Sequence, residues 1–142
     1  MYSKYDITTA KWGEVKEMGH YDMAILPWGA TEPHNLHLPY CTDMLTAQAV
    51  AFEVAEKAAM QGVNLMILPG IPLGSQNPGQ IELPYCIHTS QTTQMAILRD
   101  VVRSLKRQGI RKLMIMSGHG GNNFKGIIRD IMIEDPEMII VH

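Results

Sequence analysis

The stretch MAILPWGATEPHNLHLPYCTD, residues 23–43, decides the fold of this chain. It opens with an apolar run at 23–26 that lacks polar–apolar alternation, which is typical of a strand covered on both faces. A polar loop follows, and from Asp43 onward the apolar residues recur at helical spacing. They are Met44, Ala47, Val50, Ala51, Val54, Ala55 and Ala58. Thr42 or Asp43 is suited to cap the start of this helix, and Gly62 follows its end.

The same alternation of strand and helix continues along the chain. Apolar runs predict four strands in all, near 23–28, 64–69, 112–117 and 137–141. Between them, helical patterns predict a helix from about Ser90 to Gln108 and another that begins near Asn122. We therefore expect an α/β domain with a mainly parallel sheet and right-handed crossovers. Since His142 directly follows the last apolar run, we also expect that residues 1–142 form a single domain that lacks its C-terminal part.

Composition narrows the class of protein. The chain has 142 residues, of which 46% are hydrophobic and 18% charged, as in ordinary globular proteins. Its net charge is −2 and it has no basic stripe, so we expect no nucleic-acid partner. No apolar run approaches the ~20 residues that span a bilayer, and the N-terminus does not resemble a signal peptide. Because Cys41 and Cys86 form no CxxC pair, we expect reduced thiols and a cytoplasmic protein.

Three unusual loops follow three of the predicted strands. They cover about 28–43, 69–84 and 117–123, and they carry histidine, carboxylate, glycine and proline residues. In a parallel sheet, the carboxyl ends of the strands lie at one edge, where open α/β folds place their ligand sites. Residues far apart in the sequence are therefore expected to meet there.

Four side chains in these loops are predicted metal ligands. Glu32 and His34 are two positions apart, and Pro33 favours the extended backbone that places both on one side. Asp43 offers a second carboxylate, and His119 lies in a glycine-rich turn. Carboxylate and imidazole suit Zn²⁺ or Mn²⁺. Two metals about 3.5–4 Å apart would need a bridging carboxylate, for which Asp43 is the best candidate.

Other interpretations of these residues stay open at this point. Glu32 could be a solvated loop carboxylate, Asp43 a helix cap, and His37 a structural histidine. The glycines at 118–121 could cradle a phosphate at a helix start, and Cys41 could be a nucleophile. Three further histidines have no comparable context and are interpreted as structural: His20, His88 and His142.

Two of these blocks resemble the signature of the creatininase (creatinine amidohydrolase) family. Residues 32–43, EPHNLHLPYCTD, are similar to the family pattern E-x-H-G-x-H-L-P-x-x-T-D. Residues 118–122, GHGGN, match a second family motif, and Leu73-Gly74-Ser75 resembles the glycine–serine loop that contacts substrate. The order and spacing of the blocks agree, and the resemblance covers about residues 20 to 142.

The resemblance implies a three-layer α/β/α fold and a two-metal site. In it, Glu32 and His119 would hold one metal and His34 the other, with Asp43 bridging. We expect zinc or manganese as the cofactor. A metal-activated water would attack the amide carbon.

Four further residues in or beside these blocks complete the predicted site. Ser75, Gly118 and Gly120 are expected to bind the substrate, and His37 is the expected catalytic residue, as a proton shuttle. The chain departs from the family at two of its motif positions. Asn35 replaces a glycine, although asparagine tolerates unusual φ angles. Gly121 stands where members that act on creatinine carry a ligand glutamate.

The predicted function is that of a metal-dependent amidohydrolase. It would cleave a non-peptide or cyclic amide C–N bond of a small polar substrate, and the family usually forms homo-oligomers, often hexamers. Two alternatives remain: a peptidase or formamide hydrolase of the same family, and a metal- or phosphate-binding module without catalysis.

Overall fold

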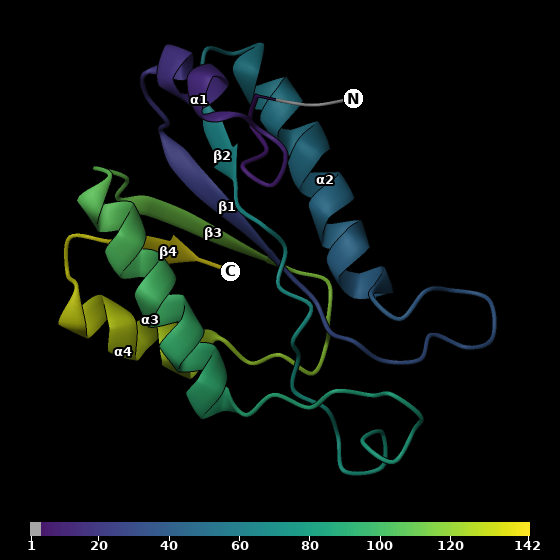
Figure 1. Cartoon of the computed structure of the whole chain (residues 1–142). Helices are drawn as coiled ribbons and strands as arrows, with labels where there is room; N and C mark the ends of the chain where they lie inside the picture. Colours follow the sequence, from purple (N-terminus) through teal and green to yellow (C-terminus); the bar gives the residue numbers. More distant parts are fainter. Residues whose placement is uncertain (1–3) are drawn as a thin grey trace.

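The computed structural model describes residues 4–142, and its sheet is built around the first strand (Figure 1). β1 (Met23–Trp28) pairs in parallel with β2 (Leu65–Ile67) on one side and β3 (Lys112–Ser117) on the other, and β4 (Ile139–Val141) pairs in parallel with β3. The strand order is β2-β1-β3-β4. The four strands lie within the predicted ranges, and β2 and β4 are shorter than predicted.

Helices cover both faces of this sheet, which confirms the predicted three-layer α/β/α fold. α2 (Thr42–Ala59) lies on one face, and α3 (Gln91–Arg107) and α4 (Lys125–Glu134) lie on the other (Figure 1). Neighbouring residues of β1 point to opposite faces. Ile25 is buried with Ala51 of α2, whereas Leu26 is buried with Leu98 of α3 and Ile131 of α4. Burial on both sides explains why the strand sequence is apolar without alternation.

The start of α2 differs from the prediction. Its N-cap residue is Cys41, which makes no side-chain capping hydrogen bond, so the prediction that Thr42 or Asp43 caps this helix is wrong. Asp43 lies in the first turn. Its carboxylate instead contacts the rings of His34 and His119. The interpretation of Asp43 as only a helix cap is therefore excluded.

The last helix also begins later than predicted. α4 starts at Lys125 rather than near Asn122. The Asn122 side chain bonds to other loops instead, since its Nδ2 donates to Gly29 O at 3.2 Å and its Oδ1 accepts from Ser75 N at 3.0 Å. The glycines at 118–121 are therefore separated from the first turn of this helix by three residues, and the phosphate interpretation gains no support from the position of the helix.

α3 follows its sequence pattern, and a short helix was not predicted. The Ser90 side chain caps α3 by accepting from Thr93 N at 3.3 Å.

The helix α1 (Trp12–Met18) has no buried residue, so its sequence carries little amphipathic pattern. Its Val15 and Met18 are partly buried against the core on the α3 side of the sheet. Among residues 4–142, no helix combines the length and apolar character needed to cross a membrane.

The carboxyl ends of β1 and β3 form the switch point of the sheet. The helix after β1 covers one face and the helix after β3 covers the other, so the two loops leave in opposite directions (Figure 1). Open α/β folds bind ligands in the crevice at such a point. The loops are tied together there, because Gly118 N donates to Trp28 O and Gly29 N donates to Ile71 O, both at 2.9 Å. The structure thus brings the three predicted loops together.

Candidate metal centre

His119 lies between two carboxylates and a backbone carbonyl. Its Nδ1 is 3.0 Å from Asp43 Oδ2 and 3.1 Å from Glu32 Oε1, and its Nε2 is 2.8 Å from Ser75 O. A carbonyl oxygen only accepts, so Nε2 carries the hydrogen and donates it to Ser75. In the neutral ring, the lone pair of Nδ1 then faces the carboxylates. Histidines that bind metals are usually held in this way, with one ring nitrogen on a carbonyl and the other on the metal.

His34 has the same arrangement. Its Nδ1 donates to Glu32 O at 3.0 Å, and its Nε2 lies 2.8 Å from Asp43 Oδ1 and 3.7 Å from Glu32 Oε1. Burial alone lowers the pKa of His34, and this is the largest single influence. The hydrogen bond to Asp43, the charges of Asp43 and Glu32, and the backbone contact together outweigh burial and raise the pKa. The site therefore favours positive charge at this nitrogen.

Two carboxylates supply the negative charge of the cluster. Glu32 is 9% exposed, and its Oε2 is buried without a hydrogen-bond partner among the described residues. Within residues 4–142, the ion pairs of Glu32 and Asp43 are all with His34 and His119, and none is with a lysine or arginine. A buried carboxylate without full compensation is costly. A bound cation would supply the missing compensation.

Three of the four side chains lie close enough together to hold a metal ion, and His34 adjoins them through Asp43. One ligand atom each from Glu32, Asp43 and His119 lies within 4.8 Å of the others. Asp43 offers Oδ2 to His119 and Oδ1 to His34. A carboxylate that presents its two oxygens to two different histidines has the geometry of a bridge between two cations.

The loop that carries His34 is shaped by the next residue. Asn35 has a φ of +57°, which is the left-handed region that glycine and asparagine tolerate best. Its Oδ1 accepts from Leu36 N at 2.8 Å. Asparagine therefore suits the backbone conformation at this position, where the family pattern has glycine.

Ser75 supports the cluster through its backbone and its hydroxyl group. Ser75 N donates to Asn122 Oδ1 at 3.0 Å, and Ser75 Oγ donates to Thr89 O at 2.8 Å. Asn122 Oδ1 also accepts from Gln94 Nε2 at 2.8 Å. Asn122 and Gln94 were not predicted as supporting residues. The place of Asn122 in the GHGGN motif is a signal that could have pointed to it, whereas Gln94 carries no such signal.

The other predicted site residues lie around the cluster rather than in it. His37 is exposed and takes no part in the hydrogen bonds of the cluster in the described part of the chain. Gly118 packs on α2, since a Cβ there would lie 2.3 Å from Asp43 O. Gly120 is exposed and faces open space. The catalytic role of His37 and the substrate-binding roles of Ser75, Gly118 and Gly120 stay predictions.

Gly121 has no room for a side chain. A Cβ at this position would lie 2.2 Å from Ser75 O and 2.6 Å from His119 Nε2. A glutamate ligand therefore does not fit at position 121 with this backbone. The packing of this turn therefore requires the glycine that stands in place of the family's glutamate.

Both cysteines are free thiols. Cys41 Sγ lies 3.7 Å from Thr31 Oγ1. Burial, together with the negative charge of Glu32, raises the pKa of the Cys86 thiol. A raised pKa lowers the population of the reactive thiolate. Neither contact supports nucleophilic catalysis by cysteine.

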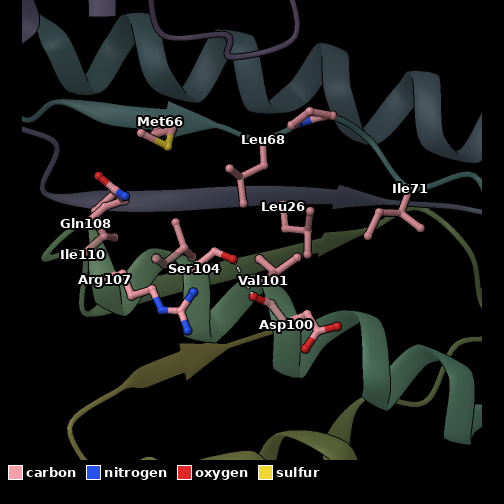
Figure 2. Close-up of a pocket in the computed structure, with 12 residues that line it drawn as sticks. Leu26, Met66, Leu68, Ile71, Asp100, Val101, Ser104, Arg107, Gln108 and Ile110 are labelled. Atoms are coloured by element: carbon pink, nitrogen blue, oxygen red, sulfur yellow. Dashed lines mark hydrogen bonds between the residues drawn. The ribbon is translucent and has the colours of Figure 1, made fainter. Parts of the chain in front are cut away.

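An apolar cavity lies on the opposite side of β1 from α2. It has a volume of about 620 Å³ and lies between α3 and the strands β1 and β2, with Leu26, Leu68 and Val101 among its lining residues (Figure 2). None of the four clustered side chains lines it. The candidate site is therefore assigned from the chemistry of the cluster and not from this cavity.

The fold and the cluster together define a class: an α/β protein with a carboxylate–imidazole cluster that could hold a metal ion, at the switch point of a parallel sheet. Residues 8–141 match the family model for creatininase, described as creatinine amidohydrolase. The chain belongs to the creatininase family.

Two curated relatives are similar over most of the chain. A creatinine amidohydrolase from Pseudomonas putida is 30% identical over 103 residues, which cover 70% of this chain and 38% of the relative. A mycofactocin precursor peptide peptidase from Mycolicibacterium smegmatis is 31% identical over 102 residues, 70% of this chain and 40% of the relative. The chain thus matches well under half of the length of these relatives.

Solved structures share the fold. A protein from Bacteroides fragilis NCTC 9343, assigned as a creatinine amidohydrolase, superposes with a TM-score of 0.96 at 55% identity, covering 99% of this chain and 56% of that one. A variant creatininase in its Zn–Zn form superposes with a TM-score of 0.79 at 25% identity, covering 99% of this chain and 57% of that one.

Proposed function

We propose that this chain carries the metal centre of a hydrolase that cleaves a non-peptide or cyclic amide C–N bond in a small polar substrate, as creatinine amidohydrolase does. The observation that supports it most is the convergence of Glu32, His34, Asp43 and His119 at the switch point. Family membership and the similarity to a creatinine amidohydrolase point to the same activity.

The donor set fits a divalent cation. Two carboxylates and two imidazoles are ligands suited to Zn²⁺ and Mn²⁺, and the orphaned Oε2 of Glu32 is an oxygen that a metal would satisfy. In this proposal Glu32 and His119 would hold one ion and His34 the other, with Asp43 available to both. When bound, such an ion polarises a carbonyl oxygen and lowers the pKa of water toward about 7.

The protein residues orient these ligands and handle the substrate. Ser75 O fixes the ring of His119 so that Nδ1 faces the carboxylates, and Glu32 O does the same for His34. Ser75, Gly118 and Gly120 would contact the polar edge of the substrate. The exposed His37 would pass a proton to the leaving nitrogen.

The described residues provide unequal ligand sets for the two ions. One ion would have Glu32, Asp43 and His119, whereas the second would have His34 and a shared Asp43. Gly121 leaves no room for the family's glutamate. Because zinc sites in proteins usually have three or four protein ligands, we propose that the first ion is held more tightly than the second.

A peptidase is the second candidate function. It is favoured by the 31% identity to a peptide peptidase, which is as high as the identity to the creatinine amidohydrolase. Assembly as a homo-oligomer, hexameric by resemblance, and a cytoplasmic location also stay predictions.

A metal-dependent assay tests the proposal. The protein is stripped with a chelator and reloaded with Zn²⁺ or Mn²⁺. It is then assayed on creatinine, on a formamide and on a short peptide. We expect tight metal retention and hydrolysis of a cyclic or non-peptide amide that Asp43→Asn abolishes. Cleavage of the peptide alone would favour the peptidase. Metal retention with no hydrolysis by the protein would contradict the catalytic proposal and favour a metal-binding module.

A further inference from the structure

The peptide group between Ser75 and Gln76 lies between two imidazoles. Its carbonyl oxygen, Ser75 O, accepts from His119 Nε2 at 2.8 Å. Its N–H, on Gln76, donates to His88 Nδ1 at 3.0 Å. The peptide is planar and its two polar ends are part of one rigid unit. A displacement of one end therefore moves the other.

These two contacts fix the hydrogens on both rings. His119 must carry its hydrogen on Nε2 to donate to Ser75 O, which leaves Nδ1 for the carboxylates. His88 must have a bare Nδ1 to accept from Gln76 N, so the neutral His88 ring carries its hydrogen on Nε2. The chain of contacts runs from the metal ligand, through one peptide, to a histidine outside the cluster.

The segment that carries His88 is held beside this peptide. Residues Gly74 and His88 form a parallel bridge. Thr89 N donates to Gly74 O at 2.8 Å, and Ser75 Oγ donates to Thr89 O at 2.8 Å. His88 is therefore fixed in position although its side chain is exposed.

We propose that His88 is a positioning residue for His119, acting through the Ser75–Gln76 peptide. The inference rests on the proposed function in so far as His119 is a metal ligand. By holding Gln76 N, His88 sets the direction of Ser75 O, and Ser75 O sets the ring plane and the tautomer of His119. The interpretation of His88 as merely structural does not explain why an exposed ring accepts from a backbone N–H in the loop that orients a ligand.

Two substitutions of His88 distinguish the effect of its hydrogen-bond acceptor from the effect of its imidazole ring. His88→Ala removes the acceptor for Gln76 N. His88→Asn keeps an acceptor, because Asn Oδ1 is attached to Cγ at nearly the same place as Nδ1 of histidine. Loss of a group outside the metal ligands typically weakens metal affinity by ~10–100-fold. Since His88 acts through one peptide, we expect His88→Ala to weaken Zn²⁺ affinity by about 10-fold, and His88→Asn to stay within about twofold of the parent.

The experiment measures Zn²⁺ affinity by competition with a chromogenic chelator, and thermal stability in parallel. His20→Ala is the matched control, because His20 is also exposed and contacts Asp22 at 3.2 Å outside the cluster. Equal affinity in His88→Ala and the parent would overturn the proposal. Equal weakening in both His88 variants would also overturn it, because the acceptor would then not be the group that matters.

A metal-free measurement keeps this inference distinct from the proposed function. In ¹⁵N NMR spectra of the metal-free protein, the Nε2–H of His119 should show a hydrogen bond to Ser75 O, and His88→Ala should weaken that hydrogen bond while His88→Asn retains it. If the parent binds no Zn²⁺, the metal function fails, and the hydrogen-bond measurement still decides whether His88 positions His119. An unchanged His119 signal in His88→Ala would reject the positioning role.

Discussion

The carboxylate of Asp43 lies 3.0 Å from Nδ1 of His119, although 76 positions separate the two residues in the sequence. The contact joins the first turn of α2 to the loop after β3. These elements lie on either side of the switch point, where their loops diverge. The local sequence around either residue does not predict this contact. It forms because β1 and β3 are adjacent parallel strands, so the segments that follow them lie side by side. The Nδ1 lone pair of His119 and the carboxylate oxygens of Asp43 both accept hydrogen bonds. At this distance, a proton or a cation between them is needed to offset their repulsion.

Replacing Asp43 by asparagine tests whether a cation binds between Asp43 and His119. Asp43→Asn keeps the size of the side chain but removes its charge and one metal-binding oxygen. We expect Zn²⁺ affinity to fall by more than the ~10–100-fold that loss of an outer partner costs. We expect the metal-free protein to stay folded, because Asp43 does not cap α2.

Asp100→Asn is the control for this substitution, since Asp100 is 82% exposed and its contact with Arg103 is a long 3.9 Å. It should bind Zn²⁺ like the parent. An Asp43→Asn protein that is folded and retains Zn²⁺ at the parent's affinity would reject Asp43 as a ligand.

The neighbouring glycines at 120 and 121 should respond differently to alanine. In Gly121→Ala the new Cβ would meet Ser75 O and His119 Nε2, which are backbone and ligand atoms that have little room to move. Overpacking of this kind destabilises by roughly 1–3 kcal/mol, and it should also weaken Zn²⁺ binding by displacing Ser75 O. Gly120→Ala meets nothing within 4 Å, so it should stay within about 0.5 kcal/mol of the parent. Chemical denaturation with and without Zn²⁺ measures both effects. Equal stability of the two variants would show that the turn relaxes freely.

The main features of the fold could be predicted because they depend on local patterns. Apolar runs without alternation predict β1 and β3 within a residue, since both strands are covered on both faces. Helix starts were less predictable. The side chains of Asp43 and Asn122 are good capping groups in isolation, but tertiary contacts in the site occupy both of them.

The convergence of the predicted ligand side chains could be predicted, whereas the residues that support them could not. Glu32, His34, Asp43 and His119 are of metal-binding types and follow strands that meet at one edge. His88 and Gln94 carry no such signal, because their roles depend on which backbone group each one meets. The steric limit at Gly121 is likewise invisible in the sequence, since Ser75, 46 positions earlier, creates it.

The backbone at Asn35 gives a prediction about stability. Its φ of +57° disfavours most side chains, and a residue other than glycine or asparagine costs roughly 1–2 kcal/mol there. Asn35→Ala should therefore lower the free energy of unfolding by about 1 kcal/mol, and it also loses the contact with Leu36 N. Asn35→Gly should lower the free energy of unfolding by less. Urea denaturation compares the two, and an Asn35→Ala protein as stable as the glycine variant would count against strain at this position.

The pKa of His34 predicts opposite pH dependences for the metal-free and the metal-loaded protein. Its folded pKa is raised above the ordinary value of about 6.5. Its contribution to stability is therefore fully present below about pH 6.5 and is lost as pH rises through the folded pKa. Zn²⁺ requires the unprotonated ring, so metal affinity should instead fall as the pH is lowered from about 8 to 6.

Melting temperatures of the protein at several pH values, with and without Zn²⁺, measure both trends. His34→Gln is the control, because glutamine does not titrate. The difference between parent and His34→Gln isolates this group from the other histidines. Without metal, the parent should lose its advantage over His34→Gln as the pH rises. With Zn²⁺, the stabilisation of the parent by metal should grow over the same range. Parallel pH profiles of parent and variant in both conditions would show that His34 neither exchanges a proton in this range nor binds the metal, and the two-histidine description of the cluster would have to be abandoned.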